Sequence, residues 1–205
     1  MVYLKKMINK YEQYLNTIGA SLDKFFAQQK PYIFCKEGCA ICCETGEYPF
    51  SELEFQYAMI GYTELDEEKK QVIQAKVKKI KEEKKLSKKV SDKKFLHECP
   101  FLLEKKCSIY KHRGIICRSY GLAYYTEDKS GKTTFTMPCC VDNGLNYSNV
   151  YDQETGIISS KKWAETGIET EPVSHNVSLD FLKNNNITKE LELDFGEARA
   201  IIDWF

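Results

Sequence analysis

The chain has 205 residues, enough for one ordinary domain with a helical arm. Hydrophobic residues make up 42% of it and aromatic residues 13%, a composition that excludes an intrinsically disordered chain. Thirty basic side chains balance 30 acidic ones, so charge gives no reason to expect nucleic acid or an anionic membrane as the main partner.

No apolar run approaches the roughly 20 residues that a membrane span needs. Residues 1–14 also lack the continuous apolar segment of a secretory signal. We therefore expect a cytoplasmic protein without a membrane partner, in which the nine cysteines stay reduced or bind metal. Nine is an odd number, which excludes a fully paired disulfide framework.

Residues 3–26 are predicted to form an amphipathic helix, which ends before Pro31. One interpretation packs this helix on its own domain; the other pairs it with a second copy in a homodimer. Its apolar stripe keeps the spacing of a heptad repeat through Leu4, Ile8, Tyr11, Leu15, Ile18, Leu22 and Phe25.

Two further helices are predicted before residue 95. Ser51 and Glu54 have the spacing of a capping box, which predicts a helix at 52–60. Thr63 is expected to cap a second helix, within a lysine-rich stretch at 64–94 that we interpret as a solvated helical insertion. Because no aromatic residues are interleaved with its lysines, a nucleic-acid surface is the less favoured interpretation. The second helix has a narrow apolar face made of Val72, Ile73, Val77 and Ile80.

The rest of the chain alternates short extended pieces with turns. A small hairpin is expected between Cys99 and Cys107, around a turn at Glu104–Lys106, and a second one within 120–137. A loop is predicted after the second hairpin, at 141–175, followed by short helices at 178–184 and 196–205.

Cysteines are the strongest signal in the sequence. Four of them lie within residues 35–43, and spacings of two or three residues let one turn direct two sulfurs at one ion. Adjacent residues generally point apart, so Cys42 and Cys43 are interpreted as serving two different metals. Zinc and an iron–sulfur cluster both suit thiolates, and the number of thiols favours the cluster. The predicted metal ligands are Cys35, Cys39, Cys42, Cys43, Cys99, Cys107, Cys117 and Cys139, with Cys140 as the alternative to Cys139.

Other residues near the cysteines carry weaker signals. His97 and His112 are candidates for ligands, although a supporting or surface role is favoured for each. Arg113 and Arg118 have two interpretations, hydrogen bonding to clustered thiolates or ordinary salt bridges. The spacing of Cys35, Cys39 and Cys42 also occurs in radical S-adenosylmethionine enzymes, but no βα repeats follow it.

Three segments together resemble the YkgJ-type cysteine-cluster family, which is described as zinc- or iron-chelating. They are Cys35-x-x-Gly38-Cys39-x-x-Cys42-Cys43, Cys99-Pro100-Phe101-Leu102 and Cys107-Ser108-Ile109-Tyr110-x-x-Arg113-x-x-x-Cys117-Arg118. One departure is Gly114, where the family usually has proline. The cysteine pattern is also similar to that of flagellin lysine-N-methylases, although the chain has no glycine-rich S-adenosylmethionine loop.

We therefore predict an α-rich small α+β fold, a metal-centred domain with short hairpins and an N-terminal amphipathic helix. The expected parts are the helix at 1–30, a metal-binding domain at 31–140 and a C-terminal segment at 141–205 that packs on it. The expected function is cytoplasmic chelation of iron, as an iron–sulfur cluster, or of zinc. The alternatives are an enzyme that uses the metal centre and a structural zinc module for interactions.

Overall fold

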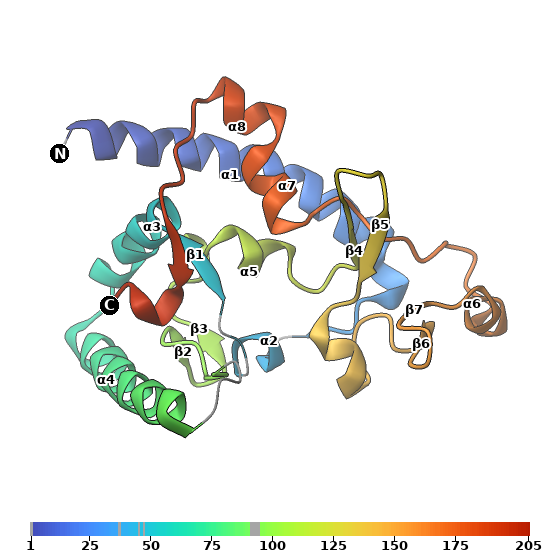
Figure 1. Ribbon diagram of the computed structural model, residues 1–205, viewed down its shortest axis with the longest axis horizontal. Helices are drawn as coiled ribbons and strands as arrows, with labels where there is room; N and C mark the ends of the chain where they lie inside the picture. The colour runs from blue at the N-terminus through green and yellow to red at the C-terminus, as the bar shows by residue number, and fades with distance from the viewer. Residues whose placement is uncertain (1, 37, 45, 47, 91–94) are drawn as a thin grey trace. The chain divides into compact units, whose positions relative to one another are not determined.

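The computed structural model describes residues 2–36, 38–44, 46, 48–90 and 95–205 (Figure 1). About half of the chain is helical, and the named strands are short and pair antiparallel in twos. The prediction of an α-rich small α+β fold is confirmed. The chain divides into two compact units, each made of two segments. We call Met1–Glu37 with Ile115–Leu193 unit 1, and Gly38–Gly114 with Asp194–Phe205 unit 2.

Unit 1 is built along the long helix α1, Val2–Gln28, which confirms the helix predicted at 3–26. Its shorter elements follow in chain order: η1 (Lys30–Tyr32), α5 (Ile115–Ser119), β4 (Tyr124–Glu127), β5 (Thr133–Thr136), η3 (Cys139–Asn143), β6 (Tyr151–Asp152), β7 (Ile157–Ile158), α6 (Ser160–Thr166), α7 (Leu179–Asn184) and α8 (Asn186–Glu190).

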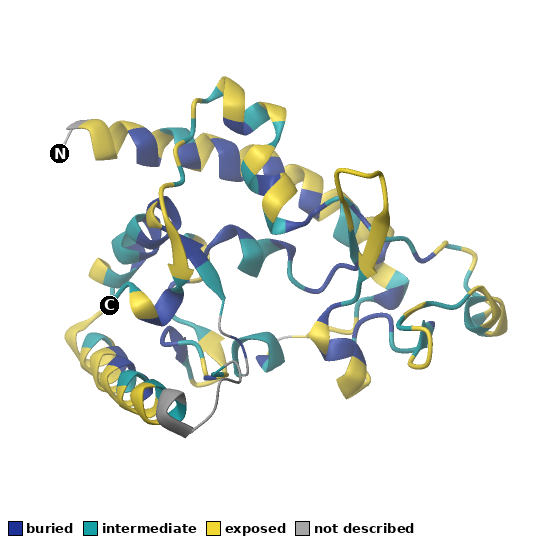
Figure 2. Cartoon of the chain, viewed as in Figure 1, coloured by how far each residue is buried: buried dark blue, intermediate teal, exposed yellow. Residues whose placement is uncertain are grey.

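The apolar stripe of α1 is largely buried within its own unit. Buried and exposed bands alternate along the helix (Figure 2), and Leu4, at 44% exposed, is the one stripe residue that is mainly solvent-exposed. The Tyr14 hydroxyl donates to the carbonyl of Leu182 in α7, and α1 also contacts α5. Packing on its own unit therefore accounts for the stripe, and homodimerisation through residues 3–26 stays a prediction.

A second cluster of buried side chains in unit 1 joins η1 to the segment after β5. It consists of Tyr32, Ala123, Val141, Tyr147 and Val150. The prediction of a loop at 141–175 is wrong, because β6, β7 and α6 lie there. The Ser159 hydroxyl caps α6 by accepting from the Lys162 N–H. This helix carries one large apolar side chain, Trp163, and so shows no apolar periodicity.

Unit 2 contains the helices α3 (Glu52–Thr63) and α4 (Glu67–Val90). The capping box of Ser51 and Glu54 is present at the start of α3, as predicted. The cap predicted at Thr63 is wrong: Thr63 ends α3, and the Asp66 carboxylate accepts from the Lys69 N–H at the start of α4. The remaining elements are α2 (Ile41–Glu44), β1 (Pro49–Ser51), β2 (Leu102–Leu103), β3 (Lys106–Cys107), η2 (Tyr110–His112), β8 (Ala198–Ala200) and η4 (Ile201–Asp203).

Two predictions for unit 2 need correction in part. Ile73, Val77 and Ile80 are buried on α4 as predicted, but Val72 is 49% exposed. Residues 91–94 of the predicted lysine-rich insertion lie outside the described residues. The helix predicted at 196–205 is instead strand β8 followed by η4, because β8 pairs with the distant strand β1.

Candidate metal centre

The two units divide the cysteines between them. None of the nine, all of which the structure describes, forms a disulfide. The motif at 35–43 is itself divided, since Cys35 belongs to unit 1 and its other three cysteines to unit 2. Unit 1 carries Cys35, Cys117, Cys139 and Cys140, and unit 2 carries Cys39, Cys42, Cys43, Cys99 and Cys107.

In unit 2, Cys42 and Cys43 lie side by side on the short helix α2. Their sulfur atoms are 3.9 Å apart. The backbone N–H of Cys99 donates to the carbonyl of Cys43 at 2.7 Å, which brings a third cysteine to the same helix. The Tyr48 hydroxyl donates to the Cys42 carbonyl and holds α2 to the residue that precedes β1.

The fourth of these thiols comes from the hairpin β2–β3, where Cys107 pairs with Leu102. Glu104 and Lys105 form the turn with φ of 47° and 62°. A two-residue turn with positive φ at both positions matches the twist of the strands it joins. The hairpin predicted between Cys99 and Cys107 is thus confirmed, with Lys106 in β3 rather than in the turn. The Ser108 N–H and hydroxyl both donate to the Phe101 carbonyl, at 2.8 and 2.9 Å.

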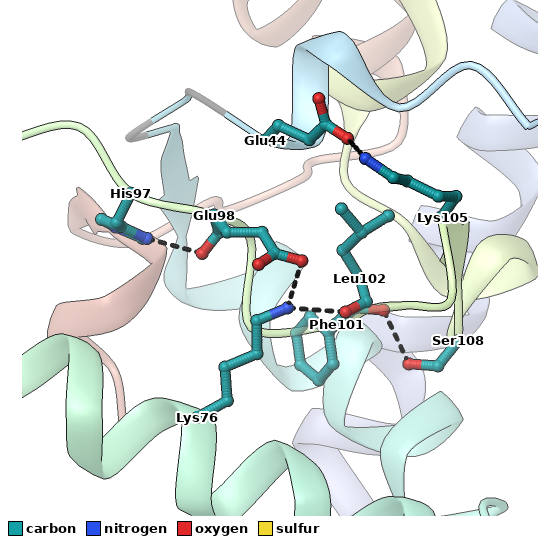
Figure 3. A network of polar contacts seen from close by, with 8 residues as sticks. All are labelled: Glu44, Lys76, His97, Glu98, Phe101, Leu102, Lys105 and Ser108. Atoms are coloured by element: carbon teal, nitrogen blue, oxygen red, sulfur yellow. Dashed lines mark hydrogen bonds and ion pairs between the residues drawn. The ribbon is translucent and has the colours of Figure 1, made fainter.

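Two lysines connect this hairpin to the helices around it (Figure 3). Lys105 in the turn pairs with Glu44 at the end of α2. Lys76 of α4 donates to the Glu98 carboxylate at 2.7 Å and to the Leu102 carbonyl at 2.6 Å. These bonds hold the segments on either side of Cys99 against α2 and α4.

The environment of Cys99 and Cys107 opposes the ionisation of their thiols. The pKa of Cys99 is raised to about 12, mainly by burial and to a smaller extent by the neighbouring thiols Cys107 and Cys42. Burial also raises the pKa of Cys107, which the guanidinium of Arg113 partly offsets. Several thiolates at this place therefore require a cation to balance them, which a bound metal ion supplies.

In unit 1, Asn146 connects the segments that carry cysteines. Its side-chain oxygen accepts from the N–H groups of Phe34 and Cys35 at 2.8 and 3.1 Å. Its side-chain nitrogen donates to the carbonyl of Gly121 at 2.9 Å, just after α5. Gly121 has a φ of 105°, and a Cβ there would lie 2.8 Å from the Asn146 nitrogen, so only glycine permits this approach.

Two thiols of unit 1, those of Cys35 and Cys140, lie near the same asparagine. Cys35 and Cys140 are hydrogen-bonded through their thiols, and this contact, together with burial, raises the pKa of Cys140. The backbone of Asn146 also bonds the Cys140 thiol. The Tyr120 hydroxyl, which follows α5 and its Cys117, donates to the Cys139 sulfur. Cys35 and Cys139 are exposed, whereas no cysteine of unit 2 is.

The donor chemistry fits a thiophilic metal, but the side chains are not arranged as a complete shell. Within the described residues, no three Cys, His, Asp or Glu side chains lie close enough together to hold a metal ion. Sulfurs bound to one tetrahedral zinc lie about 3.8 Å apart, from a zinc–sulfur distance of about 2.3 Å. The 3.9 Å between Cys42 and Cys43 matches this spacing, so these adjacent side chains do not point apart as we expected from the sequence for ligands of two different metals.

The histidines and arginines near the cysteines have contacts of their own. The Nδ1–H of His97 donates to the Glu98 carbonyl at 2.8 Å, and its buried Nε2 has no hydrogen-bond partner among the described residues. His112 packs against Tyr57 and lies 3.8 Å from the Glu64 carboxylate. The guanidinium of Arg113 lies over the ring of Tyr110, 3.8 Å from its centroid.

Sequence reasoning missed Asn146 and Lys76, the residues that fix the cysteine segments. Asn146 lies in a polar stretch with no apolar pattern, and Lys76 is one of twelve lysines at 64–94. Burial distinguishes these two residues from the other polar residues around them: Asn146 is 0% exposed and the Lys76 side chain is 17% exposed. A sequence without relatives does not show which of many similar polar residues is buried.

Unit 1 also contains a groove of about 700 Å³ whose lining includes none of these thiols. It is bordered by α1, β4, the segment 174–177, and α7 with α8, and no cysteine lines it.

A family model of cysteine-rich domains, CxxCxxCC, described as "Putative zinc- or iron-chelating domain", matches residues 34–140. The match covers slightly more than half of the chain and includes all nine cysteines. No curated protein and no solved structure matches the chain. Among the described residues, no helix has the length and apolarity to cross a membrane.

Proposed function

Because the chain belongs to the CxxCxxCC family of zinc- or iron-chelating domains, we propose that it binds zinc or iron through cysteine thiolates in the cytoplasm. The odd number of its cysteines, which excludes a fully paired disulfide framework, supports a reducing compartment. The ligand we propose is a metal ion. We expect no nucleic-acid partner, because the basic and acidic side chains of the sequence balance.

The observation that carries the proposal is the pair Cys42 and Cys43. Two sulfurs 3.9 Å apart on one turn of helix have the separation that two ligands of a single ion need. The Cys99 N–H bond to Cys43 adds a third cysteine to the same turn. A core of cysteines acting only as small apolar residues needs neither of these contacts.

The separation of Cys42 and Cys43 bears on the kind of metal. One tetrahedral zinc or iron ion takes neighbouring sulfurs at this distance, as does each iron of a two-iron cluster, whereas each iron of a four-iron cluster takes a single thiolate. We therefore favour single thiolate-bound ions over a four-iron cluster. The iron–sulfur cluster predicted from the number of thiols is the second candidate.

When bound, the metal supplies positive charge to the thiolates and joins α2 to the β2–β3 hairpin. The contacts of the chain hold these two elements in place: Tyr48 and Lys105 bond to α2, and Lys76 bonds to the hairpin. Because the metal and these contacts both connect structural elements, we favour a structural or chelating role. An enzyme that uses the centre stays a prediction, as does protein methylation.

Anaerobic purification followed by metal analysis, sulfide analysis and a visible spectrum tests the proposal. Stoichiometric zinc or iron without sulfide supports single ions. Iron with equivalent acid-labile sulfide and a brown protein supports the cluster instead. A protein that contains no metal, and takes up none when zinc or iron is added with reduced thiols, contradicts metal chelation altogether.

A further inference from the structure

We propose that Cys35 and Cys140 form a modification site, at which hydrogen peroxide converts the two thiols of the metal-free chain into a reversible disulfide. Cys35 is a predicted metal ligand and Cys140 is the alternative to Cys139, so the disulfide removes thiols from the set that binds metal. This inference rests on the proposed function and adds its regulation by oxidation. Both residues belong to unit 1, so the contact between them lies within one compact unit.

The thiols of Cys35 and Cys140 are in direct contact. They are hydrogen-bonded to one another, although the two residues are far apart in the sequence, and both are free cysteines. A disulfide forms most readily between thiols that already lie side by side, because little backbone movement then brings the sulfurs to their bonded distance of about 2.05 Å. The fold of unit 1 therefore places this pair ready for oxidation.

One buried residue, Asn146, holds both members of the pair. Its side-chain oxygen accepts from the Cys35 N–H at 3.1 Å, and its backbone bonds the Cys140 thiol. The Cys140 carbonyl accepts from the N–H of Leu145, the residue before Asn146, also at 3.1 Å. Asn146 is 0% exposed, so these bonds keep the two cysteines together when no metal joins them.

The two thiols differ in exposure, and this difference gives each of them a role. Cys35 is exposed, whereas Cys140 is buried and only 4% exposed. Dissolved peroxide therefore reaches Cys35 first, and Cys140 is the neighbour that reacts with the oxidised sulfur.

The reaction takes two steps and one peroxide. The Cys35 sulfur takes one oxygen of hydrogen peroxide and becomes a sulfenic acid, while the other oxygen leaves as water. The Cys140 sulfur then attacks the Cys35 sulfur, and the hydroxyl of the sulfenic acid leaves with the thiol proton as a second water. The two thiols thus lose two electrons in total, which reduce the peroxide. A thiol reductant reverses the reaction by thiol–disulfide exchange.

Cys42 and Cys43 provide an internal comparison, because their sulfurs are also close, at 3.9 Å. These residues are adjacent, however, and the Cα atoms of adjacent residues lie about 3.8 Å apart across a trans peptide bond. A disulfide usually joins residues whose Cα atoms are about 4.4–6.8 Å apart. Both residues also lie within α2, which would have to distort. The contact of Cys35 with Cys140 should therefore oxidise first.

Mass spectrometry of the full chain tests the assignment. The reduced, metal-free chain is treated with one equivalent of hydrogen peroxide, the remaining thiols are alkylated, and disulfides are located after proteolysis. We expect a Cys35–Cys140 disulfide as the main product, with Cys42 and Cys43 alkylated. This readout needs no variant and is therefore independent of misfolding.

Three variants separate the two roles. Cys35→Ser should lose the disulfide. Cys140→Ser should retain a sulfenic acid at Cys35, which dimedone traps. The matched control is Cys139→Ser, which removes the exposed neighbour of Cys140 and should still form the disulfide.

Zinc uptake measures the regulatory effect. The oxidised chain should bind less zinc than the reduced chain, and treatment with a thiol reductant should restore binding. If peroxide produces no Cys35–Cys140 disulfide while the reduced chain binds zinc or iron, the inference fails and the proposed function stands. If the disulfide forms and zinc uptake is unchanged, the regulatory role is wrong. If the reduced chain binds neither metal, the proposed function fails, and the regulatory role fails with it.

Discussion

The side-chain oxygen of Asn146 accepts a hydrogen bond from the backbone N–H of Cys35, across 111 residues of sequence. The same oxygen accepts from Phe34, and the side-chain nitrogen donates to the Gly121 carbonyl. Because Asn146 is completely buried, water cannot replace these bonds if the side chain is removed.

Replacing Asn146 by alanine should therefore lower the free energy of unfolding by about 3 kcal/mol, since two backbone N–H groups and one carbonyl lose their partner. The variant should also bind less metal at Cys35. The matched control is Asn143→Ala, three residues away and exposed, which should change stability by less than about 0.5 kcal/mol. Urea denaturation of both variants measures the difference, and equal stability of the two would contradict the role of Asn146.

Lys76 offers a comparable test in unit 2. Lys76→Met keeps the length and apolar contacts of the side chain but removes its bonds to Glu98 and to the Leu102 carbonyl. We expect the free energy of unfolding to fall by about 1–2 kcal/mol, and Cys99 and Cys107 to react faster with an alkylating reagent.

The control for Lys76 is Lys79→Met on the same helix. The Lys79 side chain is 75% exposed and lies 3.9 Å from the Glu83 carboxylate, a geometry that contributes little. If the two variants alkylate at the same rate, Lys76 does not hold the hairpin.

Local signals in the sequence predicted the elements that short-range physics determines. The α1 stripe, the Ser51 capping box and both hairpin turns each depend on residues within a few positions of one another. The strand β8 was mistaken for a helix because Ala200, Ile201 and Trp204 have helical spacing, whereas pairing with Pro49–Ser51 decides the conformation. Nothing within ten residues of β8 carries that information.

The candidate site shows the same limit. Cysteine spacing identified the residues of a metal site and the hairpin that carries Cys107. It did not predict that Cys35 and Cys39, only four residues apart, belong to different units. That division depends on the distant Asn146 and on the bond from Cys99 to Cys43, contacts for which a single sequence gives no signal.

Gly114, where proline was expected, has a packing explanation. A Cβ at this position would lie 2.8 Å from the Phe50 ring and 3.1 Å from the Glu54 carboxylate, which serves the capping box of α3. Gly114→Ala should therefore destabilise the protein by about 1–3 kcal/mol through overpacking.

The control Gly19→Ala should act in the opposite direction. A Cβ at Gly19 meets nothing within 4 Å, and alanine favours the helix by about 0.5–1 kcal/mol. Thermal denaturation compares the two variants. A midpoint for Gly114→Ala at or above that of the unaltered chain would show that Phe50 and Glu54 accommodate the extra methyl group.

We expect His175 to make the stability of unit 1 depend on pH. Its ring stacks on Phe25 with centroids 4.2 Å apart, and burial lowers its pKa from the usual 6.5. The unfolded chain thus takes up this proton more readily than the folded one. Stability from His175 is complete above about pH 6.5 and declines as pH falls toward the lowered pKa of the folded state.

His175→Phe should remove that part of the pH dependence. Trp163 in unit 1 reports unfolding of this unit when Trp204 is replaced by phenylalanine, so both chains are compared in that background by urea denaturation at about pH 7.5 and pH 5.5. Loss of metal in acid affects both chains alike and cancels in the comparison. The same loss of stability in both would exclude His175 as the cause.

Metal removal should unfold the cysteine-bearing elements before the long helices. The helix α2 has 4 residues and the strands β2 and β3 have 2 each, lengths that are not stable without tertiary support. Zinc binding contributes roughly 10–16 kcal/mol in zinc-finger peptides, and a domain is stable by only about 5–15 kcal/mol. By contrast, α1 and α4 bury continuous apolar faces that contain no metal ligand.

Hydrogen exchange before and after chelation, with thiols kept reduced, measures this order. We expect the amides of Cys43, Cys99 and Cys107 to lose protection on chelation, while those in the middle of α1 keep theirs. Circular dichroism should then retain much of its helical signal. The Cys99 amide is decisive because it donates to the Cys43 carbonyl, 2.7 Å away, and both residues are proposed ligands. If this amide stays as protected as α1 after the metal is removed, the cysteine-bearing elements fold without metal, and the prediction that metal stabilises them is wrong.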